Sequence, residues 1–226
     1  MSEPTLSTRL VDEPVRSNGF SSLGLWASIA ATLAGNIASA LAYKWGWIGT
    51  AELFWTYWLQ SVSIGLFNML RIATLHRFDV TGFTSNGKPV EETPAAKRST
   101  ALFFLFHYGF FHVVYAVFLS GDRLPWSDRR MVVWLLLNAA FFVVGELINY
   151  LRVHRADRTG RPNIGVLMFR PYLRIIPMHL SIIFAGVAPR AIWVFLPLKI
   201  VCDIGMLLVD AGIERRSMAH AQTSVA

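Results

Sequence analysis

The chain has 226 residues, of which 54% are hydrophobic and only 15% are charged, with a net charge of +7 and a mean hydropathy of +0.45. Soluble domains carry about 25% charged residues, and the apolar residues here fall in long runs, so the composition argues against one large soluble core. The single cysteine, Cys202, excludes an intramolecular disulfide framework. The positive charges lie between the apolar runs, which argues against nucleic-acid binding.

Residues 1–20 are polar, contain two prolines and lack a continuous apolar core, so they predict a flexible cytoplasmic tail rather than a cleavable signal peptide. Apolar runs follow, each near the ~20 residues that a ~30 Å hydrocarbon core requires. Backbone polar groups must be satisfied internally in lipid, so the runs should be helices. The sequence therefore predicts an all-α transmembrane bundle with six spans in residues 21–211, followed by a cytoplasmic tail, 212–226. The predicted spans are 21–43, 48–71, 100–119, 131–151, 171–187 and 191–211.

The distribution of Lys and Arg gives the bundle a direction. With the N-terminus inside, the inner segments hold fifteen Lys and Arg residues and the outer segments hold five. This excess predicts a plasma-membrane protein with both termini in the cytoplasm. The basic inner loops, 72–99 and 152–170, are expected to attract anionic lipid headgroups; recognition of a phosphate-bearing partner is the sharper alternative.

Four ionisable residues of the predicted spans fall at similar depth in the inner half of the bilayer, given a rise of about 1.5 Å per residue. They are His107, Glu146, His179 and Asp203. Imidazole and carboxylate together suit zinc, iron or manganese, and a metal would offset the cost of burying the carboxylates. The leading hypothesis is a membrane-embedded metal-binding protein, whether or not it is an enzyme.

Two other functions fit the same residues. The first is a small transporter or a proton or ion pathway, because histidine titrates near neutral pH. The second is a scaffold or assembly factor in which buried polar groups only fix helix packing. Bis-histidine haem ligation, through His107 or His112 with His179, is less favoured because no haem-specific motif is present. His112 lies five residues from His107, so the two point in different directions on a helix and suit one metal poorly.

Further polar candidates lie on the second and sixth spans. Glu52, Thr56 and Gln60 are spaced four apart and form a stripe that continues loosely through 63 to 68, which we expect to face the bundle interior. Lys199 and Asp203 are also four apart, a spacing that favours an ion pair within one helix. Such a pair would compete with metal binding by Asp203.

Four segments together carry a resemblance to a known group: ELFWTYWLQSVSIGLFNMLRI, FFLFHYGFFH, GELINY and PYLRIIPMHLSIIFAG. In these segments the chain resembles an uncharacterised bacterial and archaeal family of multi-pass membrane proteins, over residues 45 to 211. The resemblance implies a helical membrane fold. It implies no activity, substrate or established site.

Overall fold

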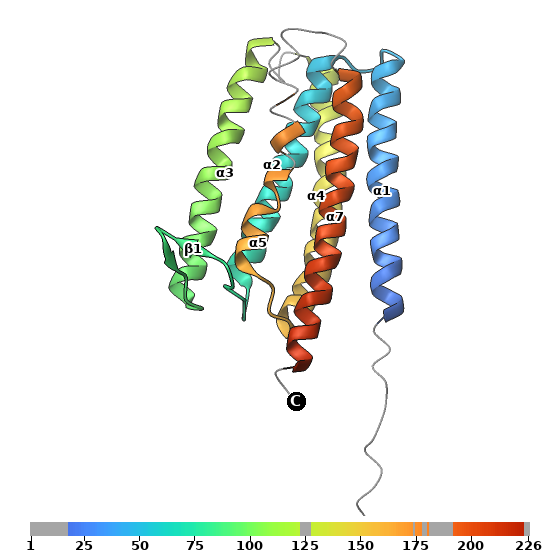
Figure 1. Ribbon diagram of the computed structural model, residues 1–226. Helices are drawn as coiled ribbons and strands as arrows, with labels where there is room; N and C mark the ends of the chain where they lie inside the picture. The colour runs from blue at the N-terminus through green and yellow to red at the C-terminus, as the bar shows by residue number, and fades with distance from the viewer. Residues whose placement is uncertain (1–17, 123–127, 174, 178–179, 181–191, 224–226) are drawn as a thin grey trace, which may run out of the picture.

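The protein is described by a computed structural model that covers residues 18–122, 128–173, 175–177, 180 and 192–223. Helices dominate this part of the chain, which confirms the all-α prediction. The long helices lie side by side along one axis (Figure 1). Their bounds are α1 Asn18–Lys44, α2 Thr50–Thr74, α3 Pro94–Asp122, α4 Arg129–Thr159 and α7 Ile192–Thr223; α5, Ile164–Phe169, is short.

Helix α2 is the centre of the bundle. It packs against α3 and α4, while α7 packs against α1 and α4. The start of α2 is capped by Glu52, whose carboxylate accepts a hydrogen bond of 2.9 Å from the backbone N–H of Gly49. Helix α4 begins at the N-cap Asp128, whose side chain accepts from the N–H of Arg130.

The predicted inner loops are more ordered than their polar composition indicated. Residues 72–99 contain a two-stranded hairpin, β1 Thr84–Ser85 and β2 Lys88–Pro89. Its turn residues Asn86 and Gly87 both have positive φ, 51° and 75°, as a type I′ turn requires. The predicted inner loop 152–170 is largely helical, because α4 continues to Thr159 and α5 follows.

The two inner loops dock on one another around Asn163, the N-cap of α5. Its amide donates to the Asp79 carboxylate at 2.8 Å and to the carbonyl of Thr81 at 3.0 Å, and its side-chain oxygen accepts from the N–H of Val166. Glu92 and Arg161 form an ion pair between the same two segments. The contacts hold α5 against α2 and α3, where Ile164 is fully buried.

The prediction of six membrane crossings finds limited support. Among the described helices, α3 and α4 are long and apolar enough to cross a bilayer. The other described helices do not meet that criterion. In α2 buried polar side chains such as Gln60 and Asn68 lower the mean hydropathy, and in α7 three buried charged residues, Lys199, Asp203 and Asp210, interrupt the apolar stretch.

Candidate functional site

Buried polar side chains run along the inward face of α2, and we call this row the seam. It consists of Thr56, Gln60, Ser61, Ser63, Asn68 and Arg71, all buried. The seam confirms that the polar stripe predicted on this helix faces the bundle interior. Glu52, at the start of the stripe, is only half-buried and caps the helix.

Near the N-terminal part of the seam, α7 and α1 contribute an ion-paired cluster. Lys199 Nζ lies 2.6 Å from Asp203 Oδ2 and donates to Asn36 Oδ1 at 2.7 Å. The Asn36 amide in turn donates to the same carboxylate oxygen at 3.1 Å. The ammonium also lies 4.4 Å from the centroid of the Tyr57 ring, a cation–π arrangement. The predicted pair between Lys199 and Asp203 is therefore confirmed, with Asn36 of α1 as a third member.

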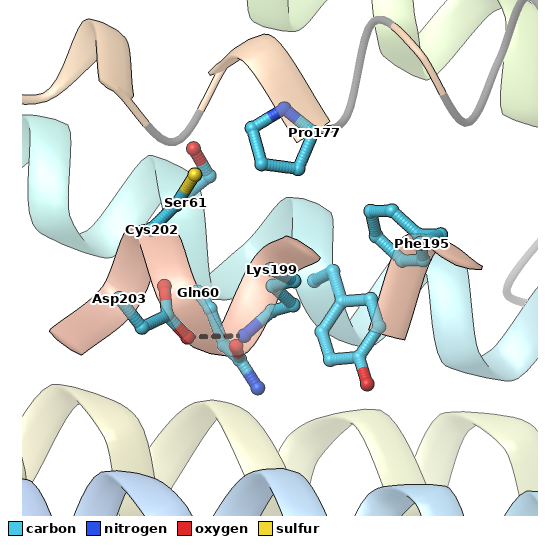
Figure 2. A pocket seen from close by; sticks show the side chains of 8 residues that line it. Gln60, Ser61, Pro177, Phe195, Lys199, Cys202 and Asp203 are labelled. Atoms are coloured by element: carbon cyan, nitrogen blue, oxygen red, sulfur yellow. Dashed lines mark hydrogen bonds and ion pairs between the residues drawn. The ribbon is translucent and has the colours of Figure 1, made fainter. Parts of the chain in front are cut away.

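A small cavity adjoins this cluster (Figure 2). Its volume is about 20 Å³, enough for one water molecule. Gln60 lies beside the Lys199–Asp203 pair, and in the described part of the chain neither its Oε1 nor the Tyr57 hydroxyl has a hydrogen-bond partner. The lining residues are Tyr57, Gln60, Ser61, Pro177, Phe195, Lys199, Cys202 and Asp203.

Two prolines interrupt the helices that carry residues of the cavity wall. Pro177 lines the cavity directly, and Pro197 lies inside α7, two residues before Lys199. Each proline lacks an N–H and so removes one backbone hydrogen bond from its helix. In membrane proteins, irregular backbone of this kind is tolerated beside other helices or a water-lined space.

Ser61 connects the seam to α3. Its Oγ lies 2.9 Å from both His112 Nε2 and the Tyr108 hydroxyl. His112 Nδ1 lies 2.9 Å from the carbonyl of Tyr108. Because a carbonyl only accepts, Nδ1 carries the proton of the neutral ring, and Nε2 accepts from the Ser61 hydroxyl. His112 thus bonds to a neighbouring helix.

At the inner end of the seam lies a second cluster, which we call the inner latch. Arg71 binds Asp157 of α4 through two hydrogen bonds, Nε–Oδ2 at 2.6 Å and Nη2–Oδ1 at 2.9 Å. Asp210 of α7 lies 3.6 Å from Arg71 Nη1 and 2.5 Å from Arg170 Nη2. Arg170 also donates to Asn68 at 3.3 Å. All members are buried, so the latch ties α2, α4 and α7 to the segment after α5.

Apolar side chains separate the two clusters. Asp203 and Asp210 are seven residues apart on α7, about 10 Å along the axis. Met206 lies between them, and Ile64 lies between Gln60 and Asn68 on α2. Both apolar side chains are buried. The seam therefore has two polar ends and an apolar break.

The comparison with known families gives one match. The model of a family of unknown function (DUF6498) matches residues 18–224. The chain belongs to this family. That membership confirms the predicted resemblance to an uncharacterised family. No curated protein and no solved structure matches the chain.

The four residues predicted as metal ligands have separate surroundings where this family member's structure describes them. His107 is exposed, and its Nδ1 lies 2.6 Å from the Tyr172 hydroxyl. Asp203 is engaged by Lys199 and Asn36. Glu146 lines a small space beside the inner latch. His179 lies outside the described residues, so the four-residue site stays a prediction.

Across the described residues, no three His, Cys, Asp or Glu side chains are grouped so that they could hold a metal. The sequence reasoning also missed the inner latch. Arg170 and Asp157 fall in the predicted inner loop 152–170, and Arg71 falls at the end of the predicted second span. One signal was available: Asp157 and Asp210 are acidic residues in otherwise basic surroundings, and such a residue calls for a paired cation.

Proposed function

We propose that this chain is a multi-pass plasma-membrane protein that conducts protons along the seam. The observation that carries the proposal is the water-sized cavity beside a buried Lys–Asp pair, with two further polar groups that lack partners. Two kinds of observation support the proposal. The first concerns where the bundle lies, and the second concerns the chemistry of its buried side chains.

The distribution of polar and apolar side chains, which is the reverse of that in a soluble protein, supports a location in the membrane. Charged side chains such as Arg71 and Asp203 are buried, whereas large apolar ones on α3 and α4 face outward. Only 28% and 11% of the most apolar stretches of these two helices are buried. The core helix of a soluble protein would be mostly buried, and a soluble surface rarely exposes such large apolar patches. Among the outward residues are Phe103, Phe106, Phe110, Val117, Leu136, Leu137, Phe141, Val144 and Ile148.

The directions of α1, α2, α3, α4 and α7 support a multi-pass topology that places the start of α1 and the end of α7 on one side; most of the predicted fifth span lies outside the described residues. In Figure 1 the hairpin, the α4–α5 connection and the end of α7 lie at one end of the bundle, together with the start of α1. That end carries most of the Lys and Arg residues outside the helices' apolar stretches, as the positive-inside rule requires of a cytoplasmic side. Exposed basic residues there, such as Arg77 and Arg155, suit anionic lipid headgroups.

Three features favour a proton as the transported species. The cavity, at about 20 Å³, is the size of one water, which is too small a space for an organic solute. The residues around it can take up, give or relay protons. Ionisable groups inside a membrane bundle commonly mark such pathways.

The same cavity weighs against a purely structural scaffold. Side chains that only lock helices together are expected to satisfy each other, since an unpartnered buried polar group costs about 1–3 kcal/mol. Gln60 Oε1 and the Tyr57 hydroxyl are buried without partners in the described part of the chain. A water or a transported ion would satisfy them.

Proton flux into vesicles tests this function. The purified protein is reconstituted into liposomes with a trapped pH dye, and a potassium gradient with valinomycin drives protons inward. We expect the parent to acidify the lumen faster than protein-free vesicles do. Asp203→Asn should reduce the rate to that of empty vesicles, because an amide cannot exchange protons as a carboxylate does.

The matched control is Asp128→Asn, which makes the same chemical change at the N-cap of α4, where asparagine caps as well as aspartate. It should conduct as the parent does. A parent protein no faster than empty vesicles, or equal rates in the two variants, contradicts the proposal.

A further inference from the structure

The Lys199 ammonium occupies a position lined by oxygen atoms. Asp203 Oδ2 lies 2.6 Å and Asn36 Oδ1 lies 2.7 Å from Nζ. The face of the Tyr57 ring, at 4.4 Å, adds a negative quadrupole. A carboxylate and a carbonyl are the ligands that hard metal cations prefer. The lysine thus holds a positive charge where a free cation of similar size would also be stabilised.

More oxygen is present than the lysine uses. The cavity beside Nζ is lined by Gln60, whose Oε1 has no partner in the described chain, and by Tyr57, whose hydroxyl has none either. Gln60 is 3% exposed and Tyr57 is 4% exposed, so neither group is bonded to bulk water. Gln60, Tyr57 and Asp203 therefore line a space the size of one water, and the Asn36 amide oxygen lies beside it, against Nζ.

We propose that these oxygens form a binding site for a monovalent alkali cation, in competition with the Lys199 ammonium. The oxygens belong to Asn36, Tyr57, Gln60 and Asp203. When the cation enters, the ammonium loses one proton, the electron pair of that N–H bond stays on Nζ, and the neutral amine moves off the carboxylate.

Charge balance selects a monovalent ion. With Lys199 protonated, its +1 charge balances the −1 charge of Asp203. With an alkali cation bound and Lys199 neutral, the sum is again zero. A divalent cation would leave one uncompensated positive charge among buried groups, which is costly. Each bound cation therefore releases one proton.

The coupling of the two ions rests on the proposed proton pathway, since the released proton leaves along the seam. Exchange of one cation for one proton moves no net charge. Binding of the cation, by contrast, can be measured in detergent whether or not the protein conducts protons.

Cation binding is tested on the purified full chain in weakly buffered solution with choline as the background cation. Sodium chloride is added, and both the heat and the pH change are recorded; potassium chloride and choline chloride are run in parallel. We expect sodium or potassium, and not choline, to release one proton per protein. Raising the pH should tighten binding, because protons and the cation compete.

Three variants separate the site from general salt effects. Lys199→Ala should bind sodium without releasing a proton, and its thermal midpoint should rise with sodium because the ion replaces the missing charge. Asp203→Asn should lose the binding. Gln60→Met keeps the ion pair and the side-chain size but removes one oxygen, so it should bind more weakly and release the same proton.

Binding by Asp203→Asn equal to that of the parent overturns the inference. So does the absence of any sodium response in both the parent and a folded Lys199→Ala. Vesicles with choline inside and outside and an imposed pH difference keep the two proposals apart: proton flux there without any effect of sodium contradicts the cation site alone.

Discussion

Arg71 shows how much of this bundle depends on single side chains. Its guanidinium makes two hydrogen bonds to Asp157 and lies 3.6 Å from Asp210, with all three side chains buried. The planar fork of arginine matches a carboxylate in a way that an ammonium cannot. Removing one partner of such a pair leaves a charge buried and uncompensated, at a cost of about 3–5 kcal/mol.

We therefore expect Arg71→Ala to lower the free energy of unfolding by about 3–5 kcal/mol. Arg71→Lys should lose less, because the charge remains while one hydrogen bond is lost. Denaturant unfolding of the purified protein in detergent, followed by tryptophan fluorescence, measures both. Arg77→Ala removes an exposed arginine at the same end of α2 and should change stability by no more than about 0.5 kcal/mol. An Arg71→Ala protein as stable as this control contradicts the role of the inner latch.

Met206 belongs to the apolar break between the two polar clusters. If the apolar break limits proton movement, a smaller side chain at Met206 should admit water and raise the rate of proton movement. We expect Met206→Ala to raise the flux in vesicles above that of the parent. The control is Leu208→Ala on the same helix, whose side chain is 54% exposed and faces away from the seam. A Met206→Ala protein with the parent's flux or less would show that the break does not limit the rate.

At the scale of elements, the packing of α2 on α3 depends on Gly65. A Cβ added there would lie 2.3 Å from Tyr108 Cε1, so either the ring or the helix must move. Tyr108 is held by its bonds to Ser61, 2.9 Å to the hydroxyl and 3.0 Å to the carbonyl, and it stacks on His112. Gly65 thus sets the distance between the helices and the position of the Ser61–His112 pair.

Gly65→Ala is expected to lower the free energy of unfolding by about 1–3 kcal/mol, the usual cost of overpacking. Gly109→Ala is the matched control on α3, where an added Cβ meets nothing within 4 Å. It should be neutral or slightly stabilising, because alanine favours a helix over glycine by about 1 kcal/mol. Equal denaturation midpoints for the Gly65→Ala and Gly109→Ala proteins would contradict close packing at Gly65.

Sequence alone predicted several elements for physical reasons that still hold. The four-residue spacing placed Lys199 beside Asp203, and the polar stripe of α2 identified its buried face. It could not predict that Asn36 of α1 joins the pair, because the rotation of one helix about another depends on packing over its whole length. Helix α5 was missed because its N-cap, Asn163, stands in a polar stretch that resembles a loop.

At the scale of the whole molecule, the described helices form an inverted bundle, in which charged side chains are buried and large apolar side chains face outward. Helices α3 and α4, which are long and apolar enough to cross a bilayer, have only 28% and 11% of their most apolar stretches buried. The proposed function places lipid around this bundle, and the direction of each helix then decides which loops meet the cytoplasm. On that proposal, the basic hairpin end and the end that contains Lys44 lie on opposite sides of the membrane.

Labelling of single cysteines in intact cells is the most direct test of this arrangement. Lys44→Cys, Ser85→Cys and Arg215→Cys are each made in a Cys202→Ala background and exposed to a maleimide that cannot cross the membrane; all three positions are exposed in the structure. We predict labelling at 44 in intact cells, and at 85 and 215 only after permeabilisation. Labelling of 44 and 85 from the same side, or recovery of the protein in the soluble fraction, would contradict the account.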